Sequence, residues 1–120
     1  MREGRRILEP FLADGARSRI EPRRVGALLG TVGLAYYRLG EVRKAIGLYE
    51  QQLGIVTEIG DRQGEGTALG NLGVVYAGLG EAEKARGLLE QALAIGRQIE
   101  DPEIVQVTAA ALERLRSGGA

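Results

Sequence analysis

The chain repeats itself at a spacing of 40 residues. Residues 29–61 (LGTVGLAYYRLGEVRKAIGLYEQQLGIVTEIGD) align without a gap with residues 69–101 (LGNLGVVYAGLGEAEKARGLLEQALAIGRQIED), and 17 of the 33 paired positions are identical. A fixed period of this kind is typical of stacked repeats, in which each unit leaves an apolar face for its neighbour to cover. The repeat therefore predicts a stack of small similar units.

Within each copy the apolar residues recur at helical spacing. A first stripe ends at a glycine, Gly40 or Gly80, and a second stripe begins directly after it. A glycine at such a point ends one helix in a left-handed conformation and lets the chain reverse. The first stripes consist of Leu29, Val32, Tyr36 and Leu39 in one copy and of Leu69, Leu72, Tyr76 and Leu79 in the other. Each copy is thus predicted to be a hairpin of two antiparallel helices.

The same periodicity gives an all-α fold in one domain over residues 1–120. Helices are predicted at 8–20, 22–38, 42–59, 62–78, 82–99 and 102–116, with Asp61 and Asp101 as N-caps. The domain divides into a partial N-terminal helix within 1–21, repeats at 22–61 and 62–101, a capping helix at 102–116 and a flexible tail at 117–120.

The many glycines raise the alternative of a phosphate-binding loop. Such a loop needs a preceding strand and, in the Walker form, a Lys-Ser/Thr pair, and GEGTALG at residues 64–70 has neither. Gly33 and Gly73 instead recur at the place where the two helices of each hairpin are expected to approach most closely. The pattern favours packing over nucleotide binding.

The composition leaves out most of the residue types that catalysis and metal binding use. The chain has no Cys and no His, so it lacks thiolates, the usual general base and the commonest metal ligand. Its carboxylates are scattered, and Ser18 and Ser117 have no His to activate them. We therefore expect no enzyme activity, no cofactor and no metal site.

Charge and hydropathy limit the classes of partner that the chain can be expected to bind. Net charge is zero, which argues against nucleic acid, although residues 1–24 hold seven Arg against four acids. That segment is either a basic arm or a solvated helix face. No apolar run is long enough for a membrane span. A cytoplasmic location is expected, and the preference for Arg over Lys hints at a GC-rich bacterial genome.

Taken together, these positions resemble the tetratricopeptide repeat. The family pattern is matched by Leu29, Val32, Gly33, Tyr36, Gly40, Ala45, Tyr49 and Leu53, and again by Leu69, Leu72, Gly73, Tyr76, Gly80, Ala85, Leu89, Ala92 and Leu93. Gln52 departs from it, because the family prefers Ala there. The period exceeds the usual length of about 34 residues and is similar to that of the longer repeats of kinesin-light-chain and LGN-type adaptors and of bacterial regulatory proteins.

The resemblance implies a right-handed superhelical stack whose first helices line a concave groove for a protein or peptide partner. The groove positions it implies are Ala27, Gly30, Leu34, Tyr37 and Arg38 in the first copy, and Thr67, Gly70, Asn71, Val74, Ala77 and Gly78 in the second. The clamp that one branch of the family uses for terminal carboxylates is absent. The groove is expected to accept an apolar segment, in a scaffold or adaptor without catalysis.

Two alternatives stay open at this point. The chain could be a self-associating structural unit, either a homo-oligomer or a piece of a longer array. Leu34, Tyr37 and Val74 would then be buried by a flanking helix or by a second chain, and would not form a free binding surface.

Overall fold

A computed structural model describes residues 21–118, which form five α-helices and contain no strand. The helices are α2 (Pro22–Arg38), α3 (Val42–Glu58), α4 (Arg62–Gly78), α5 (Ala82–Gln98) and α6 (Pro102–Arg116). The predicted all-α stack is confirmed, and every predicted boundary of these five helices agrees within one residue. The predicted helix at 8–20 and the last two residues of the predicted tail lie outside the described residues.

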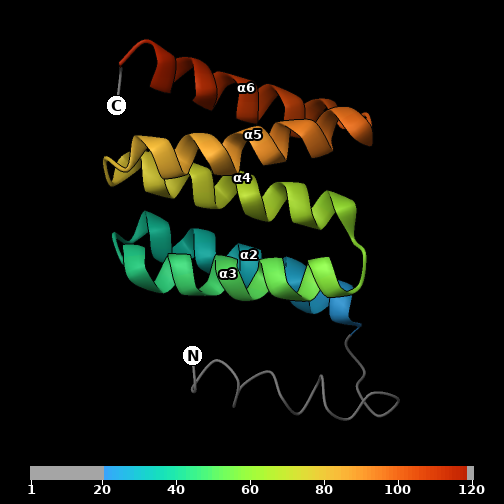
Figure 1. Cartoon of the computed structure of the whole chain (residues 1–120). Coiled ribbons are helices and arrows are strands. Elements are labelled where there is room, and N and C mark those ends of the chain that lie inside the picture. Colours follow the sequence, from blue (N-terminus) through green and yellow to red (C-terminus); the bar gives the residue numbers. More distant parts are fainter. Residues whose placement is uncertain (1–20, 119–120) are drawn as a thin grey trace.

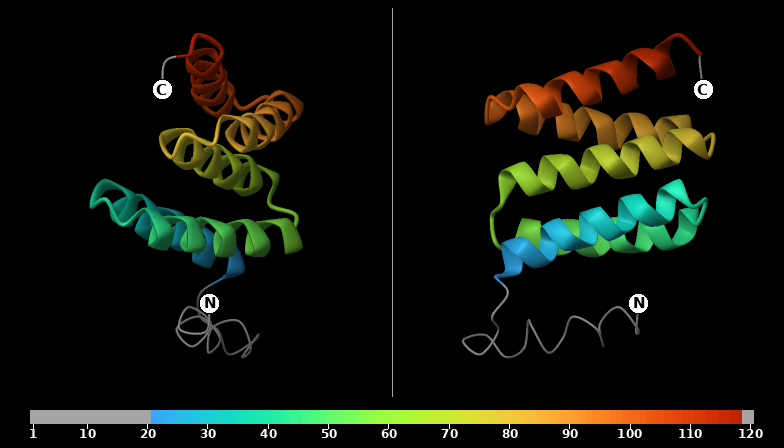
Figure 2. Two further views of the ribbon diagram at one scale, coloured as in Figure 1. Left: turned by 60° about the vertical axis from the view of Figure 1, so that its left-hand side comes forward. Right: turned by 180° about the vertical axis from the view of Figure 1, so that it is seen from behind.

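The helices form two antiparallel hairpins, α2–α3 and α4–α5, with α6 laid on the second hairpin (Figure 1). Each helix packs against the next one along the chain, and the first helices α2, α4 and α6 also contact each other in order. Seen from other sides, the hairpins lie one above the other as successive layers (Figure 2). The helix α6 packs on α5 as α4 packs on α3.

Glycine closes the turn inside each hairpin. Gly40 and Gly80 have φ angles of 82° and 81°, the left-handed region that a side chain disfavours. Beyond Gly40 the N–H of Glu41 donates to the carbonyl of Tyr36 at 2.8 Å, which satisfies an end carbonyl of α2. The turn after α5 reaches the same region with Glu100, at φ 57° and without a glycine.

Aspartates begin α4 and α6 as predicted. A side-chain oxygen of Asp61 accepts from the N–H of Gly64 at 3.0 Å, and one of Asp101 accepts from the N–H of Ile104 at 3.1 Å. These bonds pair N–H groups that have no partner inside the helix.

The same two aspartates also join neighbouring first helices. Arg23 of α2 lies 3.5 Å from the Asp61 carboxylate. Forty residues on, Gln63 of α4 donates to Asp101 at 3.1 Å. The contact between successive units therefore keeps one register through the stack.

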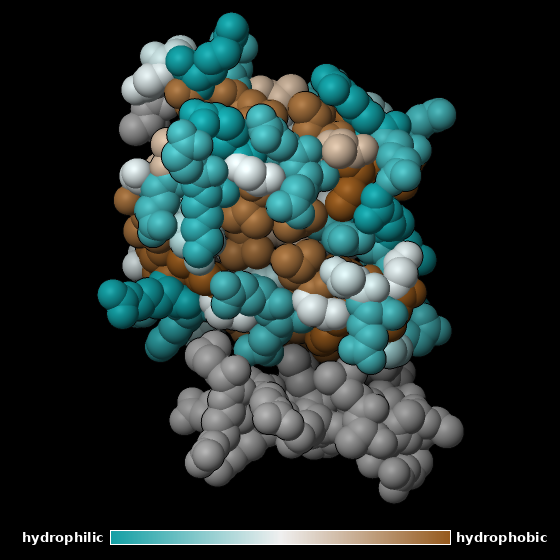
Figure 3. All heavy atoms as spheres, in the orientation of Figure 1, coloured by the Kyte–Doolittle hydropathy of each residue, from teal (hydrophilic) through white to brown (hydrophobic). Residues whose placement is uncertain are grey.

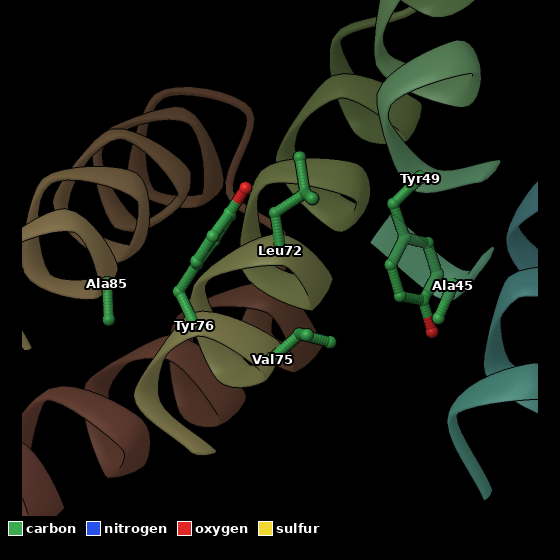
Figure 4. Packing of buried hydrophobic residues seen from close by; sticks show 6 residues of the cluster. All are labelled: Ala45, Tyr49, Leu72, Val75, Tyr76 and Ala85. Atoms are coloured by element: carbon green, nitrogen blue, oxygen red, sulfur yellow. The ribbon is translucent and has the colours of Figure 1, made fainter. Parts of the chain in front are cut away.

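The core lies between the two hairpins. Its largest cluster draws residues from α3, α4 and α5 (Figure 4), namely Ala45, Tyr49, Leu72, Val75, Tyr76 and Ala85. Tyr49 is only 1% exposed. A Cβ added at Gly33 would lie 2.8 Å from the Tyr49 ring, and one at Gly73 would lie 2.6 Å from Cγ of Leu89. The predicted close approach at both glycines is confirmed.

The first apolar stripe is less buried than predicted. Val32 is 37% exposed, whereas Leu72, its counterpart in the second copy, is 3% exposed. The difference arises because α3 covers this face of α4, and no helix of the described part covers the same face of α2. Leu39 and Leu79 are also exposed, since each stands at the C-cap beside the hairpin turn.

Candidate functional site

A groove, called the main groove below, lies between the first helices α2 and α4. It has a volume of about 450 Å³ and is closed at its base by residues of α3. Its lining consists of Arg23, Ala27, Gly30, Thr31, Leu34, Gln52, Val56, Asp61, Gln63, Gly64, Thr67 and Asn71. A volume of this size is within the range of pockets that hold ligands.

Three of the predicted site residues meet in this groove. Leu34 reaches it from α2 and is 40% exposed. Thr67 and Asn71 reach it from α4, the first exposed and the second half-buried. Ala27 and Gly30 line it as well, so the register inferred from the repeat brings these positions together.

Three other predicted residues lie in a separate pocket. Tyr37, Val74 and Ala77 are half-buried and line a space of about 180 Å³ near the other end of the helices. Ala111 and Leu115 of α6 form its opposite wall. The expected single surface is thus divided in two, because α6 lies across this end of α4. Arg38 is exposed and lines neither space.

The position of α6 also changes the surroundings of the second copy's groove face. Gly70 is buried, and a Cβ there would lie 3.4 Å from the methyl carbon of Thr108. Between α4 and α6 a narrower pocket of about 190 Å³ remains, which Thr67 and Asn71 also line. The groove beside α2 is therefore the roomier of the two.

The main groove carries no unbalanced charge. Arg23 and Asp61 are the charged residues of its lining, and they pair with each other at 3.5 Å. The hydroxyl of Thr31 donates to the carbonyl of Ala27 at 3.1 Å. The polar groups left to face a ligand are neutral, whereas Leu34 and Val56 supply apolar surface.

Sequence reasoning did not place Gln52 in the site. This residue of α3 is 4% exposed, lines the groove, and its Oε1 is buried without a hydrogen-bond partner. The only signal in the sequence was its departure from the repeat, which has Ala92 at the equivalent position.

The shifted pKa values have structural causes. Burial raises the pKa of Tyr49, Tyr37 raises it further and the Arg38 charge opposes the shift. Hydrogen bonds from the N–H of Ile104 and from Gln63 lower the pKa of the Asp101 carboxyl.

Within residues 21–118, no group of three or more acidic, His or Cys side chains is arranged to hold a metal ion. No helix in that range is long and apolar enough to cross a membrane. Hydrophobic residues are visible between hydrophilic ones over the middle of the stack (Figure 3).

The family model described as tetratricopeptide repeat matches residues 24–98, which span both hairpins. No curated protein matches the chain.

Proposed function

The chain belongs to the tetratricopeptide repeat family, and from this premise we propose that it binds a protein partner through the groove between α2 and α4, without catalysis. Repeats of this family generally mediate protein–protein interaction and scaffolding, and the family is typically non-catalytic. The partner offers a segment with apolar side chains, and neither a nucleic acid nor a membrane takes part.

The observation that carries this proposal is the groove itself. It is open, free of net charge and lined by an exposed leucine, Leu34, opposite Thr67 and Asn71. An exposed apolar side chain in a concave site is a typical anchor for a partner's segment. Tyr37, Val74 and Ala77 extend the surface toward α6 and, with Arg38, form its less open end.

The test uses the intact chain as bait and the variant Leu34→Asp. Partners captured from cell extract are identified, and binding is then measured with the purified partner. We expect Leu34→Asp to weaken binding at least about tenfold, since a charge would enter the apolar part of the interface. Helicity should not change, because Leu34 is exposed in the free chain.

The matched control is Leu39→Asp. Leu39 is 75% exposed at the end of the same helix and lines no groove. Equal loss of binding in both variants would mean that charge alone interferes. Unchanged binding by a folded Leu34→Asp chain would place the partner elsewhere.

The variety of repeat and the cellular setting are also part of this proposal. The 40-residue period supports placing the chain among the longer repeats similar to those of kinesin-light-chain and LGN-type adaptors and of bacterial regulatory proteins. A cytoplasmic scaffold in a bacterium is the setting that we propose for it.

A second candidate function is self-association. It is favoured by the outer face of α2, where Leu28 is 54% and Val32 37% exposed. Their counterparts in the second copy, Ala68 and Leu72, are 0% and 3% exposed because α3 covers them. A second copy of the chain would bury the same kind of surface.

A further inference from the structure

A glutamine at the base of the main groove has a carboxamide that the fold leaves without a complete set of partners. Gln52 is only 4% exposed, lines the groove, and its Oε1 accepts no hydrogen bond. A buried polar atom without a partner lowers the stability of the free chain. Such a cost calls for an explanation in binding or in folding.

The surroundings of Gln52 make room for its carboxamide. Gly30 of α2 lies directly against it, since a Cβ at Gly30 would be 2.6 Å from Nε2. In the second copy the equivalent pair is Gly70 and Ala92, and Thr108 lies beside that glycine. The first copy therefore combines a glycine on one helix with an amide on the other, beside open groove.

The chemistry of the groove narrows what could pair with this amide. The charged lining residues, Arg23 and Asp61, pair with each other, so the groove does not favour a phosphate, an acidic chain or a basic chain. A carboxamide carries both a donor and an acceptor. Every polypeptide carries a neutral group that complements a carboxamide, namely the main-chain peptide unit with its own N–H and C=O.

We infer that Gln52 is a binding residue that pairs with a main-chain peptide group of an extended partner segment, whose neighbouring apolar side chain contacts Leu34. This inference rests on the proposed function. It adds that the groove recognises a main-chain peptide group of the partner. Because Oε1 is buried in the free chain, binding requires the Gln52 carboxamide to turn toward the groove, and pairing then completes its hydrogen bonds. It confers affinity without demanding a particular side chain at that point.

The first experiment needs no ligand. Gln52→Met keeps the approximate shape and removes the unpaired polar atoms, so the melting temperature of the full chain should stay level or rise by a few degrees, about 4 °C. A clear fall in melting temperature would mean that the fold itself uses the amide, and would overturn the inference. Should Gln52→Met not fold, Gln52→Ala gives a second route, because it restores the residue of the second copy.

The second experiment uses a displayed library of random twelve-residue peptides, selected on the intact chain and measured by fluorescence anisotropy. Gln52→Met should weaken the selected peptides about threefold to tenfold, the loss of one or two ordinary hydrogen bonds. The matched control is Gln51→Met, the same change at a neighbouring α3 glutamine whose Nε2 is also buried and unpaired but which does not line the groove. Binding to that control should not change.

A third step identifies the group on the peptide. N-methylation of single peptide bonds should weaken binding to the parent at one position, and the same methylation should cost no further affinity in Gln52→Met. If no position behaves in this way, the Gln52 carboxamide does not pair with the main chain of the peptide.

A glycine pair gives an independent check. Gly30→Ala should press on the Gln52 carboxamide and weaken peptide binding, whereas Gly70→Ala meets only an ordinary contact at 3.4 Å and should leave it unchanged. Selected peptides that bind Gln52→Met as well as the parent would overturn the inference and leave the proposed function in place. A library that gives no groove-binding peptide would overturn both.

Discussion

At the scale of single residues, small size and backbone freedom are separate reasons for glycine in this chain. Gly40 and Gly80 occupy left-handed turns with open space where a side chain would stand, while Gly33 and Gly73 lie where a helix of the same hairpin leaves no room for a Cβ. Glu100 stands where the preceding repeat has Gly60, with a φ of 57° against 73°, so the turn that follows a hairpin does not require glycine absolutely. Each position therefore responds differently to substitution.

The contact of Gly73 with Leu89 gives a prediction. Gly73→Ala would place a Cβ 2.6 Å from Cγ of Leu89, and overpacking at this crossing should lower the free energy of unfolding by about 1–3 kcal/mol. Urea denaturation followed by circular dichroism measures the change.

The control is the same substitution at Gly87, which is exposed on α5 with no atom near the added carbon. Gly87→Ala should raise the free energy of unfolding by about 0.4–1 kcal/mol, because alanine loses less backbone entropy in a helix. If both variants shift the urea midpoint in the same direction, the crossing is not as close as described.

At the scale of helices and turns, the sequence predicts the helix ends well because the residues that end and begin helices are recognisable in it. Turn glycines and capping aspartates act within a few residues, so helix ends near Gly40, Asp61 and Asp101 follow from local chemistry. The exposure of Val32 does not follow in this way, because it depends on whether another helix lies on α2. Nor could the division of the groove be predicted, since it depends on how far α6 reaches across α4.

Gln52 illustrates the same limit. Its departure from the repeat pattern is visible in the sequence, but its burial, its unpaired oxygen and its place in the groove depend on α2 and α3 being packed together. A single sequence shows which residue is unusual and not what surrounds it.

The cap of α6 gives a prediction about pH. Hydrogen bonds from Ile104 and Gln63 lower the pKa of the Asp101 carboxyl in the folded chain. The stabilisation that this provides is present above the unfolded pKa of about 3.9 and is lost as the pH falls through the lower, folded value. Asp101→Asn keeps an N-cap acceptor and removes this titration.

The free energies of unfolding of the parent and of Asp101→Asn should therefore converge as the pH is lowered from 7 through about 4 toward 2. Urea titrations at each pH measure this. Glu90→Gln, the same kind of change at an exposed site of α5, controls for the loss of one carboxylate. A constant difference between parent and Asp101→Asn would contradict the role of the cap.

At the scale of the whole molecule, the two ends of the described stack differ. On α4, the face that packs on α5 includes Leu69, Gly73 and Tyr76. The equivalent residues of α6 are Ala109, Glu113 and Arg116, which are exposed, and the last two form an ion pair at 2.6 Å. This polar face supports the proposal that α6 caps the stack.

The other end is apolar, and self-association can be tested there. If Leu28 and Val32 hold a second copy, sedimentation velocity of the parent should show a dimer that increases with concentration, and Leu28→Lys with Val32→Lys should be monomeric. The control is Val107→Lys on α6, where an exposed valine is replaced at the opposite end. A parent that sediments as a monomer at every concentration would exclude this candidate.

The repeated link between successive first helices, Arg23 with Asp61 and Gln63 with Asp101, has a consequence for how such a gene can change length. Because both links use the same 40-residue register, tandem duplication of the DNA for residues 62–101 would insert a unit whose two ends fit their new neighbours. The polar α6 would still follow the last copied unit after each such event. Growth by internal copying thus leaves α6 unchanged, and each added unit is free to differ from its neighbours, as Gln52 differs from Ala92.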